Sequence, residues 1–438
     1  MCYDLSKYHD IILNFVPCGD VITTLSVTIY YLILQFFIMK FILENSNKVR
    51  FGKICSLSRS PNLELETPVL LVNTKAGSVM HLSHEVLMKI DGPIQCLQVP
   101  LSNSAKCYEG VRGFKKGIME FAGMKGFLSY CSVHDPAEKL TKGKNEKEQI
   151  SVNTCNGRIY ITVQRYMEIM EAFQPDMYEA LSDGYNDSNS SNRRLCKSSA
   201  NSMSYFDECM RIHEKSKILK QTPVFGVIEG GHNLIYKEKI ISHLLGNPNV
   251  CGFVISGLHS NGPDVEKLCF SSIESVVHQT LKLLPDDRVK VIHGCFRPEV
   301  VVRLIELGID IFDSSLVDIV TNRGSAFVFG WEAVDKKTTM VNGNTEGDRD
   351  KSVENELQSY KLEISLGDKI YFDDFGPLLQ GCSCLACQKH TRAYIHHLFV
   401  TKEMLGPVLL MIHNLHHYLS FFAFIRKTVR DGHRVGII

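Results

Sequence analysis

The stretch PEVVVRLIELGIDIFD, residues 298–313, sets the pattern from which the fold is predicted. In residues 298–307 the apolar side chains recur at helical spacing. Residues 308–313 form a short apolar run that is rich in isoleucine and ends in Asp313, which is typical of a buried strand. The stretch therefore predicts a helix that leads directly into a strand.

The same alternation runs along the chain from Pro68 onward. A second helix is predicted at residues 266–284. Further buried strands are predicted at residues 68–73, 158–163, 224–229, 252–256 and 288–293. Strands and helices that alternate at intervals of roughly thirty residues imply a parallel sheet, and this many repeats favour a closed TIM-type (β/α)8 barrel. The alternative is a doubly wound open sheet, but no G-x-G-x-x-G motif opens a helix after a strand.

Two polar segments interrupt this alternation. Residues 183–204 are rich in Ser and Asn, and residues 335–358 are rich in Lys, Asp, Glu and Asn. Both compositions are typical of mobile surface loops. We expect the second segment to separate the last barrel strands from the C-terminal region.

Asp313 is the residue at which chemistry is expected, because active sites of such barrels lie at the C-terminal ends of the strands. A carboxylate there could attack the anomeric carbon of a ribose and hold a covalent glycosyl intermediate. The alternative is an aspartate that caps the turn after its strand. Asp313 is therefore a candidate nucleophile with a structural alternative.

Three cysteines lie close together in GCSCLAC, residues 381–387. Cys382, Cys384 and Cys387 can turn their sulfurs inward on one tight loop, and one imidazole from a later helix would complete the tetrahedral site of a structural zinc. The alternative is that they are unrelated buried thiols. Spacing leaves the fourth ligand open among His390, His396, His397, His413, His416 and His417.

This arrangement resembles the zinc-containing tRNA-guanine transglycosylases, which carry Cys-x-Cys-x2-Cys and then a His after 25 intervening residues. Cys382, Cys384, Cys387 and His413 fit that spacing. The resemblance therefore implies one structural Zn²⁺ held by these four residues. Residues 391–398, TRAYIHHL, are similar to the family's helix between the ligands.

The resemblance begins at about Val49 and divides the chain into three parts. It implies an N-terminal hydrophobic extension at residues 1–48, a (β/α)8 barrel at 49–365, and a zinc-binding region with C-terminal helices at 366–438. The expected fold class is thus an α/β TIM barrel with an added zinc-binding subdomain.

The family's catalytic motifs are only partly present. Its nucleophile motif is similar to GIDIFD, and Asp313 falls on the nucleophile, but SSLVD follows where catalytic members have a Cys and then Pro-Thr-Arg. Tyr130 falls on the acid/base Asp of the family's Asp-Ser-Gly-Gly-Phe-Gln motif, and His134 and Asp135 lie a few residues further along. Glycosyl exchange also needs a group that protonates the leaving guanine. The resemblance therefore implies that Asp313 is vestigial and that no residue is catalytic.

Only part of the family's base-binding residues is present in this sequence. FDEC at 206–209 resembles the segment whose Asp hydrogen-bonds the purine edge, and Asp207 falls on that Asp. GVIEGG at 226–231 resembles Gly-Ile-Val-Gln-Gly-Gly, but Glu229 replaces the amide, and an ionised carboxylate only accepts hydrogen bonds. Catalytic members have paired glycines that let the base approach the backbone, and Ser256 narrows the space for the base at that place.

The sequence combines the family's barrel and zinc-site patterns with the loss of its acid/base residue. In this combination it resembles the non-catalytic subunit of the eukaryotic enzymes in this family. The implied function is that of an accessory partner in a heterodimer, whose catalytic subunit exchanges guanine for queuine at the wobble position of tRNAs with GUN anticodons. The family's dimers use the zinc region and neighbouring helices in the interface. Candidate contacts to the tRNA backbone are Lys389, Arg392, Lys402 and Arg426.

Two alternatives stay open at this point. One is an active tRNA-guanine transglycosylase that uses Asp313 as nucleophile. The other is a zinc-stabilised scaffold tethered to a membrane, because residues 21–39 carry no charge and are long enough to span a bilayer as a helix. Such an anchor could hold the protein at the mitochondrial outer membrane; otherwise the segment is an extension that packs on the barrel or stays irregular.

Composition sets limits on partners and location. The formal net charge of the 438 residues is zero, so any contact with tRNA needs a local basic patch. The 15 cysteines do not form an evident disulfide framework, which favours a reducing compartment. We therefore expect a cytoplasmic protein.

Overall fold

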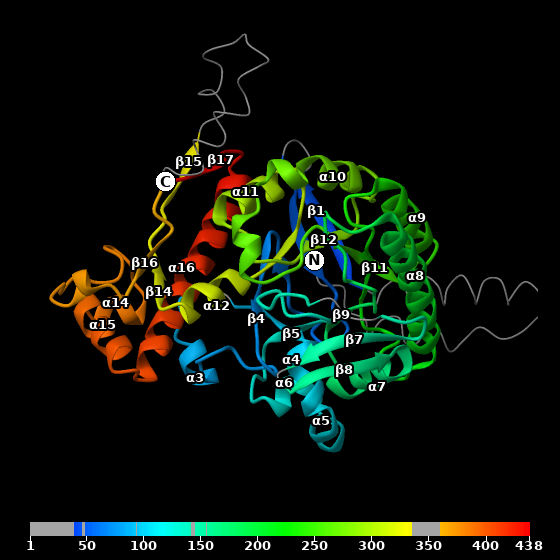
Figure 1. The fold of residues 1–438 in the computed structure, drawn as a ribbon, viewed down its shortest axis with the longest axis horizontal. Helices are drawn as coiled ribbons and strands as arrows, with labels where there is room; N and C mark the ends of the chain where they lie inside the picture. The colour runs from blue at the N-terminus through cyan, green and yellow to red at the C-terminus, as the bar shows by residue number, and fades with distance from the viewer. Residues whose placement is uncertain (1–38, 46–48, 93, 142–144, 155, 335–359) are drawn as a thin grey trace, which may run out of the picture.

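Eight parallel strands close into a barrel in the computed structural model, which describes residues 39–45, 49–92, 94–141, 145–154, 156–334 and 360–438 (Figure 1). In chain order the strands are β4 (Val69–Asn73), β5 (Cys96–Pro100), β6 (Leu128–Ser132), β9 (Met177–Glu179), β10 (Val224–Ile228), β11 (Val250–Ile255), β12 (Val289–Ile292) and β13 (Ile311–Asp313). Each of these strands pairs with the next along the chain, and β13 pairs with β4. The predicted barrel is confirmed.

Helices connect these strands and lie outside them (Figure 1). They are α3 (His84–Leu87), α4 (Leu101–Ser104), η2 (Ala105–Cys107), α5 (Tyr108–Phe114), α6 (Gly117–Phe121), α7 (Val163–Phe173), α8 (Asn192–Lys215), α9 (Leu234–Leu245), η3 (Pro263–Lys267), α10 (Ser271–Lys282), α11 (Pro298–Leu307) and α12 (Ser315–Asn322). α11 has the predicted bounds, and Gly308 ends it with a φ of 109°. Glycine adopts that left-handed conformation at little cost, and the chain turns back into β13.

A three-stranded antiparallel sheet covers the amino-terminal end of the barrel. It consists of β1 (Lys40–Asn45), β2 (Phe51–Cys55) and β3 (Leu65–Glu66). Ile54 and Leu65 belong to the same buried cluster as the barrel interior. Arg50 Nε donates to Asp310 Oδ1, just before β13, at 2.8 Å. The carboxyl ends of the strands therefore form the mouth of the barrel on the opposite side.

The chain after α12 forms two small sheets and a group of helices beside the barrel. Strand β14 (Ser325–Phe327) pairs with β16 (Glu363–Ser365), and β15 (Trp331–Val334) pairs with β17 (Arg434–Ile437). The helices are η4 (Lys369–Tyr371), α14 (Leu385–Lys389), α15 (Arg392–Val400) and α16 (Leu405–Arg430).

Helix α16 joins this group to the barrel. It packs against α12 and β14 on the barrel side and against α14 and α15 on the other (Figure 1). It is long and apolar enough to cross a membrane, but 78% of its most apolar stretch is buried inside the protein. Such burial is typical of a core helix in a folded domain.

Residues 158–163 form a strand, but the prediction that this strand is buried is wrong. The strand, β8 (Gly157–Thr162), pairs with β7 (Gln149–Thr154) in an antiparallel hairpin outside the barrel, and five of its six residues are exposed. β-branched and aromatic residues fit an exposed hairpin as well as a barrel strand, so the run alone did not distinguish the two.

The loop predicted at residues 183–204 is wrong for its second half, because α8 begins at Asn192. Ser191 caps this helix by accepting a hydrogen bond from the backbone N–H of Arg194. Its small polar residues face inward: the Ser198 hydroxyl donates to the backbone O of Asp183 at 2.7 Å. The predicted loop at 335–358 and all but the last residue of the predicted membrane segment 21–39 lie outside the described residues.

Candidate functional site

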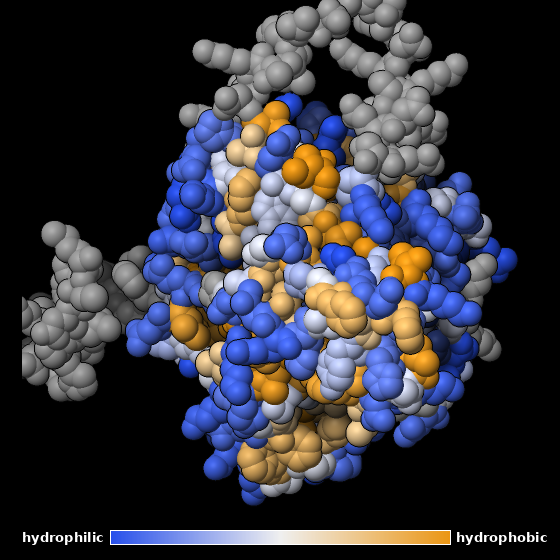
Figure 2. Space-filling model, turned by 90° about the vertical axis from the view of Figure 1, so that its left-hand side faces the viewer, coloured by the Kyte–Doolittle hydropathy of each residue, from blue (hydrophilic) through white to orange (hydrophobic). Residues whose placement is uncertain are grey.

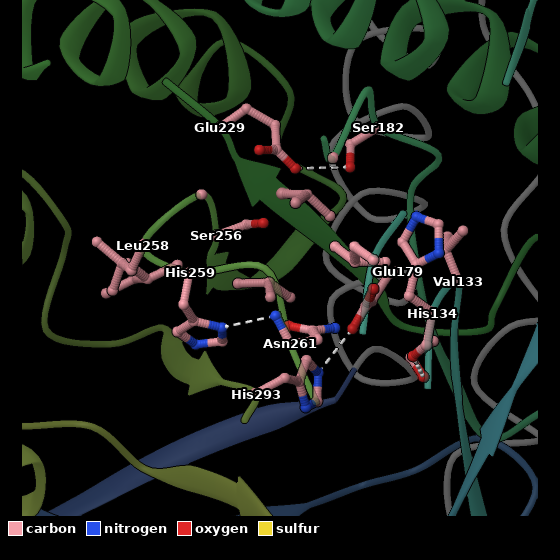
Figure 3. Close-up of a pocket in the computed structure, with 17 residues that line it drawn as sticks. Val133, His134, Glu179, Ser182, Glu229, Ser256, Leu258, His259, Asn261 and His293 are labelled. Carbon is pink, nitrogen blue, oxygen red and sulfur yellow. Dashed lines mark hydrogen bonds and ion pairs between the residues drawn. The ribbon is translucent and has the colours of Figure 1, made fainter. Parts of the chain in front are cut away.

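Side chains from three barrel strands meet at the mouth, where His293 contacts Glu179 (Figure 3). Glu179 is the last residue of β9, His293 follows β12, and Asp313 is the last residue of β13. The Nε2 atom of His293 is 2.7 Å from Glu179 Oε1, and its Nδ1 is 3.1 Å from Asp313 Oδ2. Burial alone would lower the pKa of His293, but hydrogen bonds to both carboxylates raise it to about 9. At neutral pH His293 is therefore an imidazolium.

Asp313, the predicted vestigial nucleophile, is held by hydrogen bonds on both of its oxygens. Besides the contact with His293, its Oδ2 accepts from the backbone N–H of Gly294 at 2.9 Å. Its Oδ1 accepts from the backbone N–H of Ser315, also at 2.9 Å. The side chain has no exposed surface. Both oxygens are therefore engaged within the protein.

Tyr130, at the predicted place of the acid/base, points into the barrel from β6. Its hydroxyl donates to Glu179 Oε1 at 3.0 Å, the same oxygen that His293 contacts. Burial and the charge of Glu179 raise the pKa of Tyr130 well above that of a free phenol. The phenol therefore keeps its proton at neutral pH and is a poor acid.

A cavity of about 60 Å³ opens beside His293. Its polar lining includes Glu179, Ser182, Glu229, Ser256, His259 and His293 (Figure 3). Glu229 follows β10 and accepts hydrogen bonds from the Ser182 hydroxyl at 3.0 Å and from Asn186 Nδ2 at 3.2 Å. Burial raises the pKa of Glu229. The acceptor that replaces the family's amide is thus already satisfied by neighbouring residues.

Lys237 is fully buried behind this cavity. Its ammonium group donates to the backbone O of Ser256 at 2.9 Å. Burial lowers the pKa of Lys237 to about 8, although the charge of Glu229 opposes that shift. The lysine therefore brings a positive charge close to Glu229 and ties α9 to the end of β11.

A candidate metal centre lies beside the barrel. The ligand atoms of Cys382, Cys384, Cys387 and His413 all lie within 4.8 Å of one another. The Nε2 atom of His413 is 2.9 Å from the backbone O of Phe327. A proton on Nε2 leaves Nδ1 free to face the three sulfurs, as metal ligation requires. These four residues could hold a metal ion.

Two other histidines that spacing had left open face backbone carbonyls. The Nδ1 atom of His396 is 2.7 Å from the backbone O of Leu366, and the Nε2 atom of His417 is 3.0 Å from the backbone O of Phe329. The geometry therefore agrees with His413 as the fourth member of the group.

Comparison with known proteins agrees with this combination of barrel and Cys3His group. A family model described as Queuine tRNA-ribosyltransferase matches residues 47–435. The chain belongs to the queuine tRNA-ribosyltransferase family. The queuine tRNA-ribosyltransferase accessory subunit 2 of Anopheles gambiae is 36% identical over 398 residues, which cover 90% of this chain and 88% of the relative. The proteins of the same name from Pongo abelii and Homo sapiens are 37% and 36% identical over 399 residues, covering 88% of this chain and 94% of each relative.

The resemblance to the queuine tRNA-ribosyltransferase family predicted that Asp207 lies at the base pocket, and this prediction is wrong. Asp207 lies on α8, its side chain is 62% exposed, and it pairs with His243 Nε2 at 2.7 Å. Asp183, by contrast, is buried, follows β9 and forms an ion pair with Arg194. Matching by residue type alone misplaced this position, because α8 carries Asp207 away from the mouth.

Glu179 and His293 were missed as site residues, although the sequence carried a signal for both. Each lies at the carboxyl end of a barrel strand, where residues of an active site are expected. His293 closed a predicted strand, at residues 288–293, but its partners come from strands far away in the chain. The pairing depends on barrel closure, which no local pattern reveals.

A second pair of carboxylates lies deeper at the same end of the barrel. Asn73 Nδ2 donates to Asp135 Oδ1 at 3.0 Å and to Asp318 Oδ2 at 2.8 Å. Lys75 forms an ion pair with Asp135. Burial and the charge of Asp135 raise the pKa of Asp318 well above its usual value. The fold therefore favours the protonated form of Asp318 more than the unfolded chain does.

The substitution Asp318→Asn is expected to raise Tm at pH 7. Because the pKa of Asp318 is higher in the folded than in the unfolded state, the unfolded state loses this proton at a lower pH, from about pH 4 upward, which favours unfolding. The amide removes that penalty. Thermal unfolding from pH 4 to pH 7 should show a difference from wild type that is absent at pH 4 and largest at pH 7.

The matched control is Asp135→Asn, which breaks the ion pair with Lys75 and should lower Tm at pH 7. A loss of Tm at pH 7 for Asp318→Asn of the same size as for Asp135→Asn would contradict a raised pKa of Asp318.

Proposed function

We propose that this chain is the non-catalytic accessory subunit of a queuine tRNA-ribosyltransferase heterodimer, whose partner exchanges guanine for queuine at the wobble position of tRNAs with GUN anticodons. The observation that carries the proposal is the state of the barrel mouth: the Tyr130 hydroxyl donates to Glu179, and both oxygens of Asp313 are engaged within the protein. The resemblance aligns Tyr130 with the family's acid/base. The relatives that carry the printed name accessory subunit 2 support it over about 90% of the chain.

Base exchange on a ribose requires two groups that this mouth does not offer. A carboxylate must attack the anomeric carbon, and a second group must protonate the departing base. Asp313 has no exposed surface. The Tyr130 phenol has a raised pKa. An active transglycosylase, the second candidate, would have to use Asp313 with Glu179 or His293 as acid, and these groups are bound to one another.

The proposal is tested by incorporation of labelled guanine into a tRNA with a GUN anticodon. We expect no incorporation by this chain alone, and incorporation when a catalytic subunit of the family is added. Asp313→Asn in this chain should leave the activity of the mixture within about twofold of wild type, because the chemistry takes place on the partner. Turnover by this chain alone that Asp313→Asn abolishes would contradict the proposal.

We also propose that the Cys3His group binds one structural Zn²⁺. Three thiolates and one imidazole form a closed tetrahedral ligand set, which leaves no open position for catalysis. The hydrogen bond between His413 and Phe327 supplies the second contact that orients a ligating histidine. The ion would stiffen a small region of short helices and loops beside the barrel.

Purified wild-type protein should contain one zinc per chain by elemental analysis, and Cys384→Ala should contain none. Without the ion, the segment around α14 and α15 is expected to unfold locally and to become sensitive to protease. The matched control is Cys209→Ala, which removes an equally buried thiol far from the group and should keep the zinc. A full complement of zinc in Cys384→Ala would show that the ion does not use this group.

Exposed apolar side chains around the candidate metal centre support a partner surface there. The set includes Ile370, Phe372, Phe375, Tyr394, Val400 and Met404, with exposures between 41% and 86%. They belong to η4, α15 and the segments beside them. Helices α14 and α15 lie on the left of Figure 1, and Figure 2 shows that side, where hydrophobic residues lie among hydrophilic ones. Apolar side chains that gather on one face are typical of a protein interface.

We also propose that this chain contacts tRNA. Two of the four basic candidates already bind other groups of the protein. Arg392 pairs with Asp374 at 2.8 Å, and Arg426 donates to the backbone O of Pro68 at 3.0 Å. Lys389 and Lys402 are exposed and are the better candidates for phosphate contacts.

The double substitution Phe372→Asp with Phe375→Asp is expected to weaken the heterodimer at least about tenfold in Kd, since buried aromatic residues dominate interface energies. Both side chains are 76% exposed, so the fold should persist. The control is Ile235→Asp, 74% exposed on α9 on the other side of the barrel (Figure 1). Analytical ultracentrifugation of the mixed subunits measures the effect. Equal Kd values for wild type, the double variant and Ile235→Asp would exclude this surface as the heterodimer interface.

A further inference from the structure

The contacts of His293 require two N–H donors on one ring. Its Nε2 faces Glu179 Oε1 at 2.7 Å and its Nδ1 faces Asp313 Oδ2 at 3.1 Å. Ionised carboxylates only accept hydrogen bonds, whereas a neutral imidazole has one donor and one acceptor. With both carboxylates ionised, the two contacts are satisfied together only when the ring carries both protons. The geometry therefore describes an imidazolium held between two carboxylates.

His293 also lies between the cavity and Asp313. The ring of His293 lines the cavity, and Asp313 does not. The space in front of the ring is about 60 Å³. Pockets that enclose small-molecule ligands measure roughly 300–1,000 Å³. A ligand that enters the mouth would therefore meet His293 before it could reach Asp313, and a bicyclic base has no room.

Other groups packed against the ring do not compete for its charge. The Tyr130 hydroxyl on β6 donates to Glu179. The amide nitrogen of Gln98 on β5 donates to the Ser132 hydroxyl at 3.0 Å and lies further away, 3.4 Å, from His293 Nδ1. His259, which follows β11, has its pKa lowered to about 4 by burial and is neutral. The charged groups around the ring are thus Glu179 and Asp313, whose combined charge exceeds that of one imidazolium.

We propose that His293 is a built-in occupant of the barrel mouth, whose imidazolium fills the site between Glu179 and Asp313 and keeps both a base and a ribose away from Asp313. The inference builds on the proposed accessory role and explains how this barrel is closed to substrate. In this proposal Glu179 and Asp313 form a binding site for a planar cation with two N–H donors. The His293 side chain of the same protein supplies that cation.

Removal of the ring should leave a cavity that accepts free imidazole. We expect the full-length His293→Gly protein to bind one imidazole per chain at pH 6.5 in isothermal titration calorimetry, with a rise in Tm on binding. The matched control is His259→Gly, which opens the same cavity beside a neutral histidine. Imidazole should bind His293→Gly at least about tenfold tighter than His259→Gly, because charge-assisted hydrogen bonds to the two carboxylates hold it there. Wild type should not bind imidazole or guanine.

A measurement on the unaltered protein decides the question if His293→Gly does not fold. With histidine labelled at carbon, nuclear magnetic resonance should show one imidazole that is charged at pH 7.5 and loses its proton only near pH 9, and this signal should be missing in His293→Asn. A neutral His293 at pH 7.5, or stoichiometric binding of guanine to wild type, would overturn the proposal. Neither readout needs a partner or tRNA, so failure to stimulate a catalytic subunit would count against the accessory role alone.

Discussion

A carboxylate that is buried at the mouth of a barrel has to be matched by donors, and the arrangement of this site follows from that constraint. An unpaired carboxylate away from water costs several kcal/mol, and Asp313 has no exposed surface. Its charge is met by the backbone N–H groups of Gly294 and Ser315 and by the ring of His293. The same contacts that keep Asp313 in the fold withdraw it from chemistry. Glu179 and Tyr130 extend the chain of contacts across the barrel.

Helix α16 is the second element on which the architecture depends, because it serves the barrel and the candidate metal centre at once. His413 contributes its ring to the Cys3His group. The next residue, Asn414, accepts a hydrogen bond from the backbone N–H of Phe327 and donates to the backbone O of Ser325, both at 2.9 Å. The Cys3His group is therefore fixed to β14, which directly follows the last barrel helix. A partner that docks on this region would be held in a defined position relative to the barrel.

Much of this could be predicted from the sequence, and the failures have physical causes. The strand and helix periods of residues 298–313 are local properties, and so is the spacing of Cys382, Cys384 and Cys387, so these predictions agree with the structure. α8 was missed because its serines pack inward around Asp183 instead of facing solvent. The partners of His293 come from β9 and β13, and only closure of the barrel brings them together.

The central claim is that the glycosyl chemistry of the complex takes place on the partner and never on Asp313. Retaining base exchange passes through a covalent bond between a carboxylate and the ribose. The complex can be incubated with labelled tRNA in the absence of free base, denatured during turnover, and its subunits separated. The account predicts that RNA stays attached to the catalytic partner alone. An RNA-linked peptide that contains Asp313 would contradict it.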